Sequence, residues 1–418
     1  MRQAPSDAAT PGPLDGLRVI ELAGVVMGPL AGQILGDLGA DVIKVETVFG
    51  DVTRQYLPRR NDDMGWLALN LNRNKRSVVL DLRSERGKHA LATLLETADV
   101  LLTNLRPNSL AHLDLMPDEV TAKYPRLVYA TAQGFRSGSG EENRAAYDDV
   151  IQAESGVVWL NQQMTGQPFL LPTLLADKVC GLVLAQSIMA ALYYRATHGR
   201  GQHVELPMLD TMFSFGLIEH VGGAVFEPPA AAFGYSRALS PFHKAFPVKD
   251  GAVCVLPYGD RNWHDFFALL GCPDWANDPR FGTRDARAKH IDELYAMVGE
   301  LTRPFTTAQL LEACTEHGIA ASPVRSLDEA VATDYVRDGG LFQVAEHPTE
   351  GPYRLIGSPV RYSRTPASVR RHCPHIGEHT AEILTEIGLV ATDPSNRPAS
   401  SPTDSTDSTE STEGHTRR

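Results

Sequence analysis

The regular alternation of short apolar runs with helical patterns is the feature that most constrains the fold. From Leu14 onward, five segments rich in Val, Ile or Leu are predicted to be strands, at 17–22, 41–46, 77–82, 99–103 and 127–131. Helical patterns lie between them, at 28–38, 84–96 and 109–123. This order is typical of a parallel sheet covered by helices. The sequence therefore predicts an α/β fold with a Rossmann-like parallel sheet.

Ligands of such sheets bind outside the carboxyl ends of the strands. The segments in which we expect a site are therefore the loops after Leu22, Glu46, Thr103 and Thr131.

A change of composition predicts a second, smaller α+β domain. Around Gly222 to Ser240 the chain becomes rich in Gly, Pro and Ala. A hairpin is predicted next, over 245–256 with the turn Lys249-Asp250-Gly251, because Asp-Gly readily supplies positive φ. Helical patterns follow at 263–270, 290–301 and 307–317. We expect a large domain over 14–221, the small domain with its linkers over 222–327, and a return to the large domain over 328–390, ending in an amphipathic helix at 380–387.

Two end segments are predicted to be disordered, residues 1–13 and 391–418. The second is almost entirely Ser, Thr, Pro, Asp and Glu with no large apolar residue, so its burial cannot offset the entropy of ordering.

Composition and charge exclude several classes of protein. The five cysteines are odd in number and have no CxxC spacing, which is typical of free thiols in a reducing compartment. The first twelve residues resemble neither a signal peptide nor a transit peptide, so we expect a cytoplasmic protein. The longest apolar stretch, 179–194, falls short of the roughly 20 residues of a membrane span and predicts a core helix. A net charge of -12 argues against nucleic-acid binding.

Three familiar sequence motifs for cofactor binding or catalysis are absent or incomplete. The loop Ala23 to Pro29 lacks the GxGxxG pattern of dinucleotide-binding proteins. No GxSxG or Walker sequence occurs. The cluster His372-Cys373-Pro374-His375 with His379 lacks the second pair of ligands of a structural zinc site, so we expect a loop leading into the last helix and no bound metal.

A series of ordered motifs resembles the family III CoA-transferases, also called the CaiB/BaiF family. These motifs are Pro13 to Leu22, Gly28-Pro29, Leu38 to Glu46, Gly50-Asp51, Asn72 to Ser77, Asn104 to Pro107, Ala146 to Ala153, Ala176-Asp177, Gly199 to Gln202 and Gly377 to Thr380. The resemblance implies that the large domain binds coenzyme A (CoA). It implies acyl-CoA and carboxylic acids as substrates, no permanently bound cofactor, and an interlocked homodimer.

The family's catalytic aspartate falls on Asp177, at the head of the predicted helix 179–194. An ordinary Asp has a pKa near 3.9, and an anion is favoured at a helix N-terminus, so this carboxylate needs no partner base. It would attack an acyl-CoA thioester and form an aspartyl-CoA thioester by way of mixed anhydrides. The alternative is a structural N-cap, a position that Asp favours.

The resemblance also implies the CoA-binding residues. All of them lie at strand ends or in connecting loops: Val26, Met27, Asn72, Arg73, Asn74, Lys75, Asn104, Leu105, Arg106, Gln133, Gly134 and Phe135. Lys75 is the leading candidate for a phosphate contact because an ammonium meets phosphate as a point charge. Arg54 is a weaker one. The alternative for each of these cations is a solvated surface charge.

Two other functions stay open. Racemases of the same family place a histidine where this chain has Tyr147, and tyrosine is a poor base at neutral pH, so transfer is favoured over racemisation. Tyr147 could equally be a buried aromatic. A non-enzymatic CoA-binding protein is the third reading. Val26 and Met27 make one edge of the pocket apolar, which favours a larger dicarboxylate or a branched acid over oxalate, with succinyl-CoA as a possible donor.

Overall fold

The computed structural model describes residues 11–389. The disorder predicted for 391–418 lies outside the described residues, as does most of that predicted for 1–13. Within 11–13, the carbonyl of Gly12 accepts a hydrogen bond from the backbone of Asp15 at 3.2 Å.

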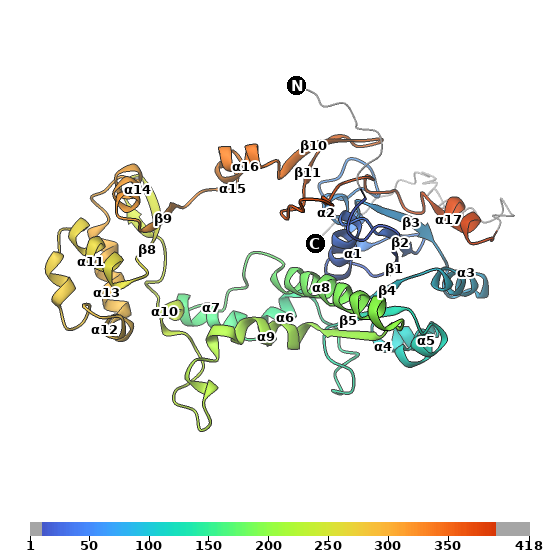
Figure 1. The fold of residues 1–418 in the computed structure, drawn as a ribbon, viewed down its shortest axis with the longest axis horizontal. Helices are drawn as coiled ribbons and strands as arrows, with labels where there is room; N and C mark the ends of the chain where they lie inside the picture. The colour runs from blue at the N-terminus through green and yellow to red at the C-terminus, as the bar shows by residue number, and fades with distance from the viewer. Residues whose placement is uncertain (1–10, 390–418) are drawn as a thin grey trace, which may run out of the picture.

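A six-stranded, entirely parallel sheet forms the centre of the fold (Figure 1). Its strands are β1 (Arg18–Leu22), β2 (Asp41–Glu46), β3 (Lys75–Val79), β4 (Val100–Thr103), β5 (Val128–Gln133) and β6 (His203–Pro207). The order β3-β2-β1-β4-β5-β6 reverses at β1 and β4, as in doubly wound nucleotide-binding sheets. The predicted α/β fold and parallel sheet are confirmed. β3 begins two residues earlier than predicted, and β6 was not predicted.

Helices cover both faces of the sheet. One face packs against α1 (Met27–Asp37), α8 (Leu175–His198) and α9 (Met208–His220), and the other against α3 (Glu85–Glu96), α4 (Pro107–His112), α5 (Pro117–Lys123) and α17 (Thr380–Glu386). Successive residues such as Val19 and Ile20 belong to opposite cores, because strand side chains alternate between faces. The single helix predicted at 109–123 is two helices, since Asp114 has a positive φ of 58° and Pro117 begins the second.

The remaining elements of this part connect the strands. They are the 3-10 helix η1 (Val52–Gln55), α2 (Trp66–Leu71), α6 (Asp148–Glu154) and α7 (Val157–Thr165). Among the described residues, α8 is long and apolar enough to cross a membrane, but half of its apolar window is buried. That burial is typical of a core helix.

A second hydrophobic cluster lies far from the parallel sheet. The hairpin of β7 (Phe246–Val248) and β8 (Gly251–Leu256) is antiparallel as predicted, and β9 (Ala320–Pro323) adds an unpredicted third strand. The surrounding helices are α11 (Asp260–Leu269), α12 (Arg284–Lys289), α13 (Ile291–Leu301) and α14 (Thr307–Glu316), with the 3-10 helix η3 (Pro273–Asn277). The cluster has its own apolar centre, which includes Phe266 and Phe267. The domain boundaries themselves stay a prediction.

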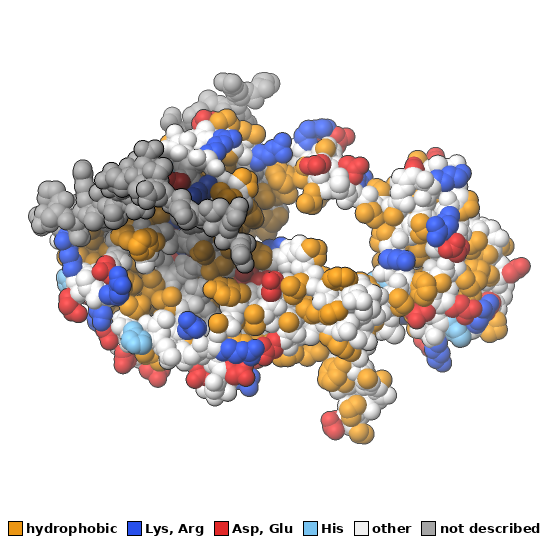
Figure 2. All heavy atoms as spheres, turned by 180° about the vertical axis from the view of Figure 1, so that it is seen from behind, with side chains coloured by type: hydrophobic (Ala, Val, Ile, Leu, Met, Phe, Trp, Pro, Cys, Tyr) orange, Lys and Arg blue, Asp and Glu red, His pale blue; other side chains and the backbone are white. Residues whose placement is uncertain are grey.

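Two connections join the sheet to this distal part. The outgoing one continues from α9 through η2 (Gly222–Val225) and α10 (Ser236–Leu239); the returning one contains α15 (Leu327–Val331), α16 (Asp334–Gly339) and the hairpin β10 (Phe342–His347) and β11 (Gly351–Ile356). Figure 2 shows an open hole between them. The last described segment packs beside β3, where the backbone of His379 donates to the Ser77 carbonyl at 3.0 Å.

A buried ionic network lies inside the sheet. Glu21 on β1 bridges two lysines, with its Oε1 2.9 Å from Nζ of Lys44 and its Oε2 2.8 Å from Nζ of Lys75. Lys44 also contacts Asp51 at 3.1 Å and donates to the Ala23 carbonyl at 2.7 Å. All four charged side chains are at most 2% exposed. Buried charges persist only when they are paired, so this network fixes the loop after β1.

Gly32 on α1 tests how tightly the network is packed. A Cβ added there would overlap Oε2 of Glu21. We expect Gly32→Ala to lower the free energy of unfolding by about 1–3 kcal/mol, the usual cost of overpacking. Gly216→Ala on α9 is the control, because that glycine faces open space and gains about 0.5–1 kcal/mol of helix propensity. Urea titration measures both, and a Gly32→Ala protein as stable as wild type would contradict the packing.

Candidate active site

Asp177 lies in the first turn of α8, not at its cap. The helix begins at Leu175, four residues earlier than predicted, and its N-cap is Leu174. The N-cap alternative is therefore wrong. The Asp177 residue is only 8% exposed, although it lines a cavity. A carboxylate that is largely removed from water without serving as a cap calls for another explanation.

Asp148 is the residue that holds Asp177, and the sequence analysis gave it no role. It is the first residue of α6 and is 4% exposed. Its Oδ1 accepts the backbone N–H of Asp177 at 3.0 Å, and its Oδ2 accepts from Nε2 of Gln152 at 2.5 Å. The motif Tyr147-Asp148-Asp149 was quoted for its resemblance, but nothing in the sequence shows that α6 and α8 meet at this point.

The protonation of Asp177 differs from the sequence expectation. Burial, together with the smaller effects of the negative charges of Asp148 and Asp149, raises the pKa of Asp177 to about 7. The sequence argument assumed an ordinary pKa near 3.9. The protonated form of this carboxyl is therefore appreciably populated near neutral pH, and the ionised form, which can act as a nucleophile, increases as the pH rises.

A cavity of about 320 Å³ joins Asp177 to the carboxyl edge of the sheet. Eight of its lining residues were singled out from the sequence: Met27, Asn104, Leu105, Arg106, Gln133, Gly134, Tyr147 and Asp177. They come from the loops after β1, β4 and β5 and from the starts of α6 and α8. The cavity also includes Gly24, whose backbone N–H donates to Oδ1 of Asn104 at 3.0 Å.

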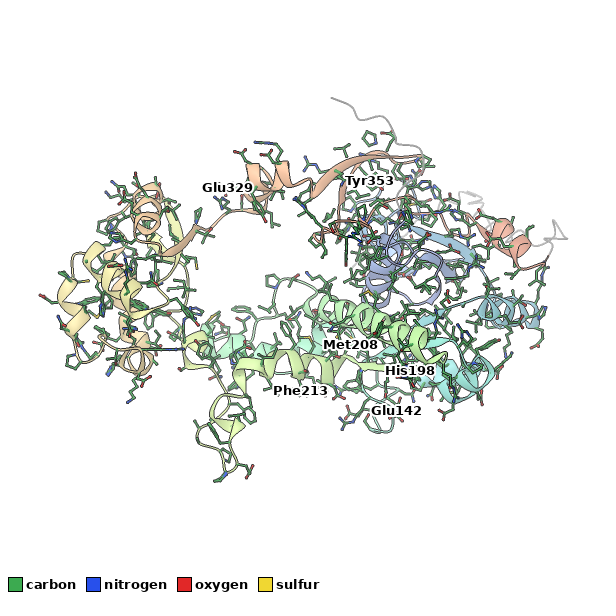
Figure 3. All side chains as sticks on the ribbon, in the orientation of Figure 1. Glu142, His198, Met208, Phe213, Glu329 and Tyr353 are labelled. Atoms are coloured by element: carbon green, nitrogen blue, oxygen red, sulfur yellow. The ribbon has the colours of Figure 1, made fainter. Side chains whose placement is uncertain are left out.

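Tyr147 and Met208 also belong to the wall of this cavity. Tyr147 is 65% exposed at its rim, so the buried-aromatic alternative is wrong. Met208, the first residue of α9, was not anticipated because β6 was not predicted. Figure 3 labels Met208 at the start of α9, next to α8.

Six of the twelve predicted CoA-binding residues lie outside the cavity, and two of these, Val26 and Phe135, are neighbours of residues that line it. Val26 lines a separate apolar groove between α1, α2 and α8. Phe135 is 3% exposed in the core, with the guanidinium of Arg144 4.8 Å above its ring.

The structure corrects the prediction for the segment Asn72 to Lys75. These residues precede or begin β3, so they lie at the amino end of the strand, away from the edge where parallel sheets bind ligands. Asn72 is fully buried, and Arg73 pairs with Asp37 at 2.7 Å. Oδ1 of Asn74 accepts the backbone N–H groups of Arg370 and Arg371 at 2.6 and 3.0 Å.

Lys75 itself has no exposed surface. Its ammonium contacts Glu21, the Pro29 carbonyl at 2.9 Å and Oδ1 of Asn72 at 3.1 Å. Burial lowers the pKa of Lys75 to about 8, with the nearby charge of Lys44 adding to that effect and Glu21 opposing it. Lys75 is therefore a structural cation in this conformation and not the phosphate contact that we expected.

Arg54 is also interior. It is fully buried, donates to both oxygens of Glu46 at 2.8 and 2.7 Å, and donates to the Pro374 carbonyl at 2.9 Å. The weaker prediction of a phosphate contact at Arg54 is corrected in the same way.

The histidine and cysteine cluster holds the returning chain against the sheet. Nδ1 of His375 lies 2.8 Å from Asp63, and Nε2 of His347 lies 2.8 Å from the Cys373 carbonyl. Within residues 11–389, no group of three or more His, Cys, Asp or Glu side chains is arranged to hold a metal ion.

Asp177 thus lines a cavity at the carboxyl edge of a doubly wound sheet, the edge at which such sheets bind their ligands. The model of CoA-transferase family III matches residues 14–380. The chain therefore belongs to the family III CoA-transferases, which confirms the resemblance and the enzyme class.

Similar proteins agree with this membership. The succinate–glutarate CoA-transferase of Agrobacterium fabrum (strain C58) is 31% identical over 386 residues, covering 90% of this chain and 96% of the relative. A formyl-CoA:oxalate CoA-transferase of Escherichia coli O81 is 30% identical with the same coverage. Among solved structures, Rv3272 of Mycobacterium tuberculosis has a TM-score of 0.78 at 30% identity, covering 90% of this chain and 100% of that one. A CAIB/BAIF family protein from Brucella suis has a TM-score of 0.76 at 29% identity, with the same coverage.

The raised pKa of Asp177 can be tested directly. A carbodiimide labels only protonated carboxyls, so labelling of the Asp177 peptide, followed by mass spectrometry, should fall with a midpoint near pH 7. Asp148→Asn removes the neighbouring charge and should lower that midpoint, because the ionised form is then less disfavoured.

The amide oxygen that Asp148→Asn introduces could still accept the Asp177 N–H, although its NH₂ group cannot accept from Gln152 as the Asp148 carboxylate does. Asp149→Asn is the matched control and should shift the midpoint less, since Asp149 is the smaller contributor. A midpoint near 4 in the wild type, the ordinary value for Asp, would contradict the assignment.

Proposed function

We propose that this chain transfers CoA from an acyl-CoA to a carboxylic acid through a covalent intermediate on Asp177. The observation that carries the proposal is the position of Asp177: a carboxylate with a pKa of about 7, held by Asp148 through its backbone, that opens into a cavity at the carboxyl edge of the sheet. Membership of a CoA-transferase family supplies the reaction class.

The reaction balances without an added energy source. The Asp177 carboxylate attacks the thioester carbonyl, a mixed anhydride forms, and CoA leaves as thiolate. The thiolate attacks the aspartyl carbonyl, which gives an aspartyl-CoA thioester and releases the donor acid. The acceptor carboxylate then attacks that thioester, and the returning thiolate forms the new acyl-CoA and regenerates Asp177. In the cavity, CoA would contact Gln133, Gly134 and the loop Asn104 to Arg106.

For the substrates, we infer succinyl-CoA as donor and a dicarboxylate larger than oxalate as acceptor. The cavity wall next to Asp177 contains the apolar residues Met27, Ala132 and Met208, while Arg106 supplies positive charge. Aliphatic carbons fit these apolar residues and a distal carboxylate fits Arg106. One relative at 31% identity carries the name succinate–glutarate CoA-transferase, which agrees with this choice.

We also infer a cytoplasmic, interlocked homodimer with a large domain over 14–221 and 328–390 and a small domain over 222–327. All five cysteines are free, which supports a reducing compartment. The separate core around Phe266 supports the small domain. Leu182 and Tyr193 on α8 and Ile218 on α9 are 58%, 74% and 77% exposed, an apolar surface that a second chain would cover. The hole in Figure 2 would admit that chain.

Covalent transfer is tested by trapping the activated carboxyl. With an acyl-CoA donor and hydroxylamine, wild-type protein should form a hydroxamate on the Asp177 peptide, visible by mass spectrometry. Asp177→Asn should form none and should lose about a thousandfold or more in transfer rate. Asp149→Asn is the control and should keep both. Transfer that persists in Asp177→Asn would refute the proposal, and entry of solvent deuterium next to the thioester without CoA exchange would favour a racemase.

The interlocked arrangement is tested by closing each chain into a covalent ring with an engineered disulfide. A Cβ on Gly377 would lie 3.5 Å from Cβ of Val79, within the range of a disulfide. The pair Val79→Cys and Gly377→Cys should therefore oxidise within one chain, despite a cost of about 1–2 kcal/mol for a side chain at φ of 68°. Linked rings should run as a dimer on denaturing, non-reducing gels.

One engineered protease cut between residues 79 and 377 should then release single chains, which a disulfide between chains would not allow. Val79→Cys alone is the control and should run as a monomer. A monomer band for the oxidised double variant would contradict the interlocked arrangement.

A further inference from the structure

Gln152 on α6 is a fully buried polar side chain that bonds to Asp148 and lies outside the cavity at Asp177. Its amide makes three hydrogen bonds. Nε2 donates to Oδ2 of Asp148 at 2.5 Å and to the Thr173 carbonyl at 3.1 Å, and Oε1 accepts the backbone N–H of Leu171 at 3.0 Å. One side chain therefore joins α6 to the chain that leads into α8.

The start of α8 has no cap of its own. Its N-cap residue is Leu174, whose side chain makes no capping hydrogen bond. An N-cap side chain normally accepts the N–H of the second or third residue of the helix. Asp177 is the third residue of α8, and its N–H is accepted by Asp148 from α6 at 3.0 Å. Asp148 therefore caps α8 from a neighbouring helix.

The chain that leads into α8 lies near the surface. Thr173 is exposed, and Leu174 is 38% exposed. The backbone of Thr173 donates to the Leu171 carbonyl and that of Leu175 donates to the Thr173 carbonyl, both at 2.7 Å. Those two bonds stay within the segment itself, whereas the two from Gln152 tie it to a packed helix.

The bond from Gln152 also sets the orientation of the Asp148 carboxylate. Among residues 11–389, Gln152 is the donor to Oδ2 of Asp148, and the Asp177 N–H is the donor to Oδ1. A buried carboxylate oxygen that loses its donor is costly. Without Gln152, Asp148 would turn toward another partner and leave the start of α8 uncapped.

We propose that Gln152 is a positioning residue for the reaction, which holds Asp148 as the cap of α8 and so fixes the carboxyl of Asp177 in the cavity. The proposal rests on the CoA-transferase function above. Gln152 does not line the cavity, so it acts through Asp148 and the segment 171–173. A misplacement of about 1 Å at a reacting group costs about a hundredfold in rate. Loss of Gln152 should therefore affect turnover and not substrate binding.

The protonation of Asp177 responds to the same contact. The titratable and charged side chains around it are Asp148 and Asp149 on α6, Lys178 and Cys180 on α8, and Arg106, Arg144 and Tyr147 on the cavity wall. An Asp148 that turns away places less negative charge beside Asp177, so the pKa of Asp177 falls from about 7. Burial is the larger cause and remains, so the pKa stays above the ordinary value near 4.

The first test replaces Gln152 by a residue of similar size that forms no side-chain hydrogen bond. Gln152→Leu should lower kcat for CoA transfer about a hundredfold and leave KM for the acyl-CoA unchanged. The carbodiimide-labelling midpoint of Asp177 should fall below that of wild type. Gln163→Leu, at an exposed position of α7, is the matched control and should change none of the three.

The second test makes the bond between positions 148 and 152 depend on pH. In Gln152→Glu, the protonated carboxyl can donate to Asp148, but the ionised one cannot. The ratio of its kcat to that of wild type should therefore fall about tenfold or more between pH 6 and pH 9, because an adjacent carboxylate raises the pKa of such a group by several units. Adding Asp148→Asn should abolish that fall, because the new amide donates at every pH and its oxygen can accept the Asp177 N–H.

A wild-type kcat in Gln152→Leu, a loss confined to KM or an unshifted labelling midpoint would overturn the proposal. If Gln152→Leu does not fold, a pH-independent ratio for Gln152→Glu would overturn it. Labelling is measured without substrate. A wild-type protein that transfers CoA from no donor would refute the proposed function, while the labelling midpoints would still test how Asp177 is held, so the two failures are distinct.

Discussion

The pairing of Glu21 with Lys44 and Lys75 is the interaction on which the site geometry depends. Three adjacent strands each contribute one charged residue to the interior, and none of the three is more than 1% exposed. Lys44 holds the Ala23 carbonyl and Asp51 holds the Val25 N–H. These two contacts therefore fix the conformation of the loop after β1, including the positive φ of 68° at Val25. In dinucleotide-binding sheets, glycines let this turn approach a diphosphate; here buried ion pairs fix it. Removing one partner would leave an uncompensated buried charge, which is strongly destabilising.

Burial and neighbouring charges also determine the protonation of Asp177. Burial and two neighbouring carboxylates hold its pKa near the middle of the physiological range. A carboxylate that is costly to ionise is more basic and is a stronger nucleophile once it is ionised. The N-terminal end of α8 stabilises the ionised form of Asp177, and the cavity gives a substrate access to it. The site thus combines a helix terminus, which favours the anion, with surroundings that disfavour it.

The sequence predicted the parts of this structure that depend on local pattern. β1, β2 and β4 are rich in Val, Ile and Leu, β5 consists mostly of small and aromatic residues, and all four are buried on both faces; they were found within one or two residues. β3 was placed two residues late because it begins with Lys75 and Arg76, which an apolar criterion excludes. β6 was missed because His203–Pro207 holds His, Glu and Pro on an edge strand. The cavity loops after β1, β4 and β5 were found because strand ends carry ligands.

The sequence could not predict what distant residues do to each other. A lysine on a solvated surface and a lysine paired to a buried glutamate look alike in one dimension, and so Lys75 and Arg54 were assigned to phosphates. The contact between Asp148 and Asp177 joins two helices that are separated by α7, and with it comes the raised pKa. Burial and charge at a site are properties of the tertiary structure, which a motif does not encode.

The central claim is that the carboxylate of Asp177 takes part in the reaction covalently. It is tested most directly by following oxygen. In the proposed sequence the acceptor acid leaves one of its carboxylate oxygens on Asp177 in each turnover. With an acceptor labelled with ¹⁸O in both oxygens, the peptide containing Asp177 should gain about 2 Da after a single turnover. New acyl-CoA formed with no gain of mass on that peptide would contradict the account.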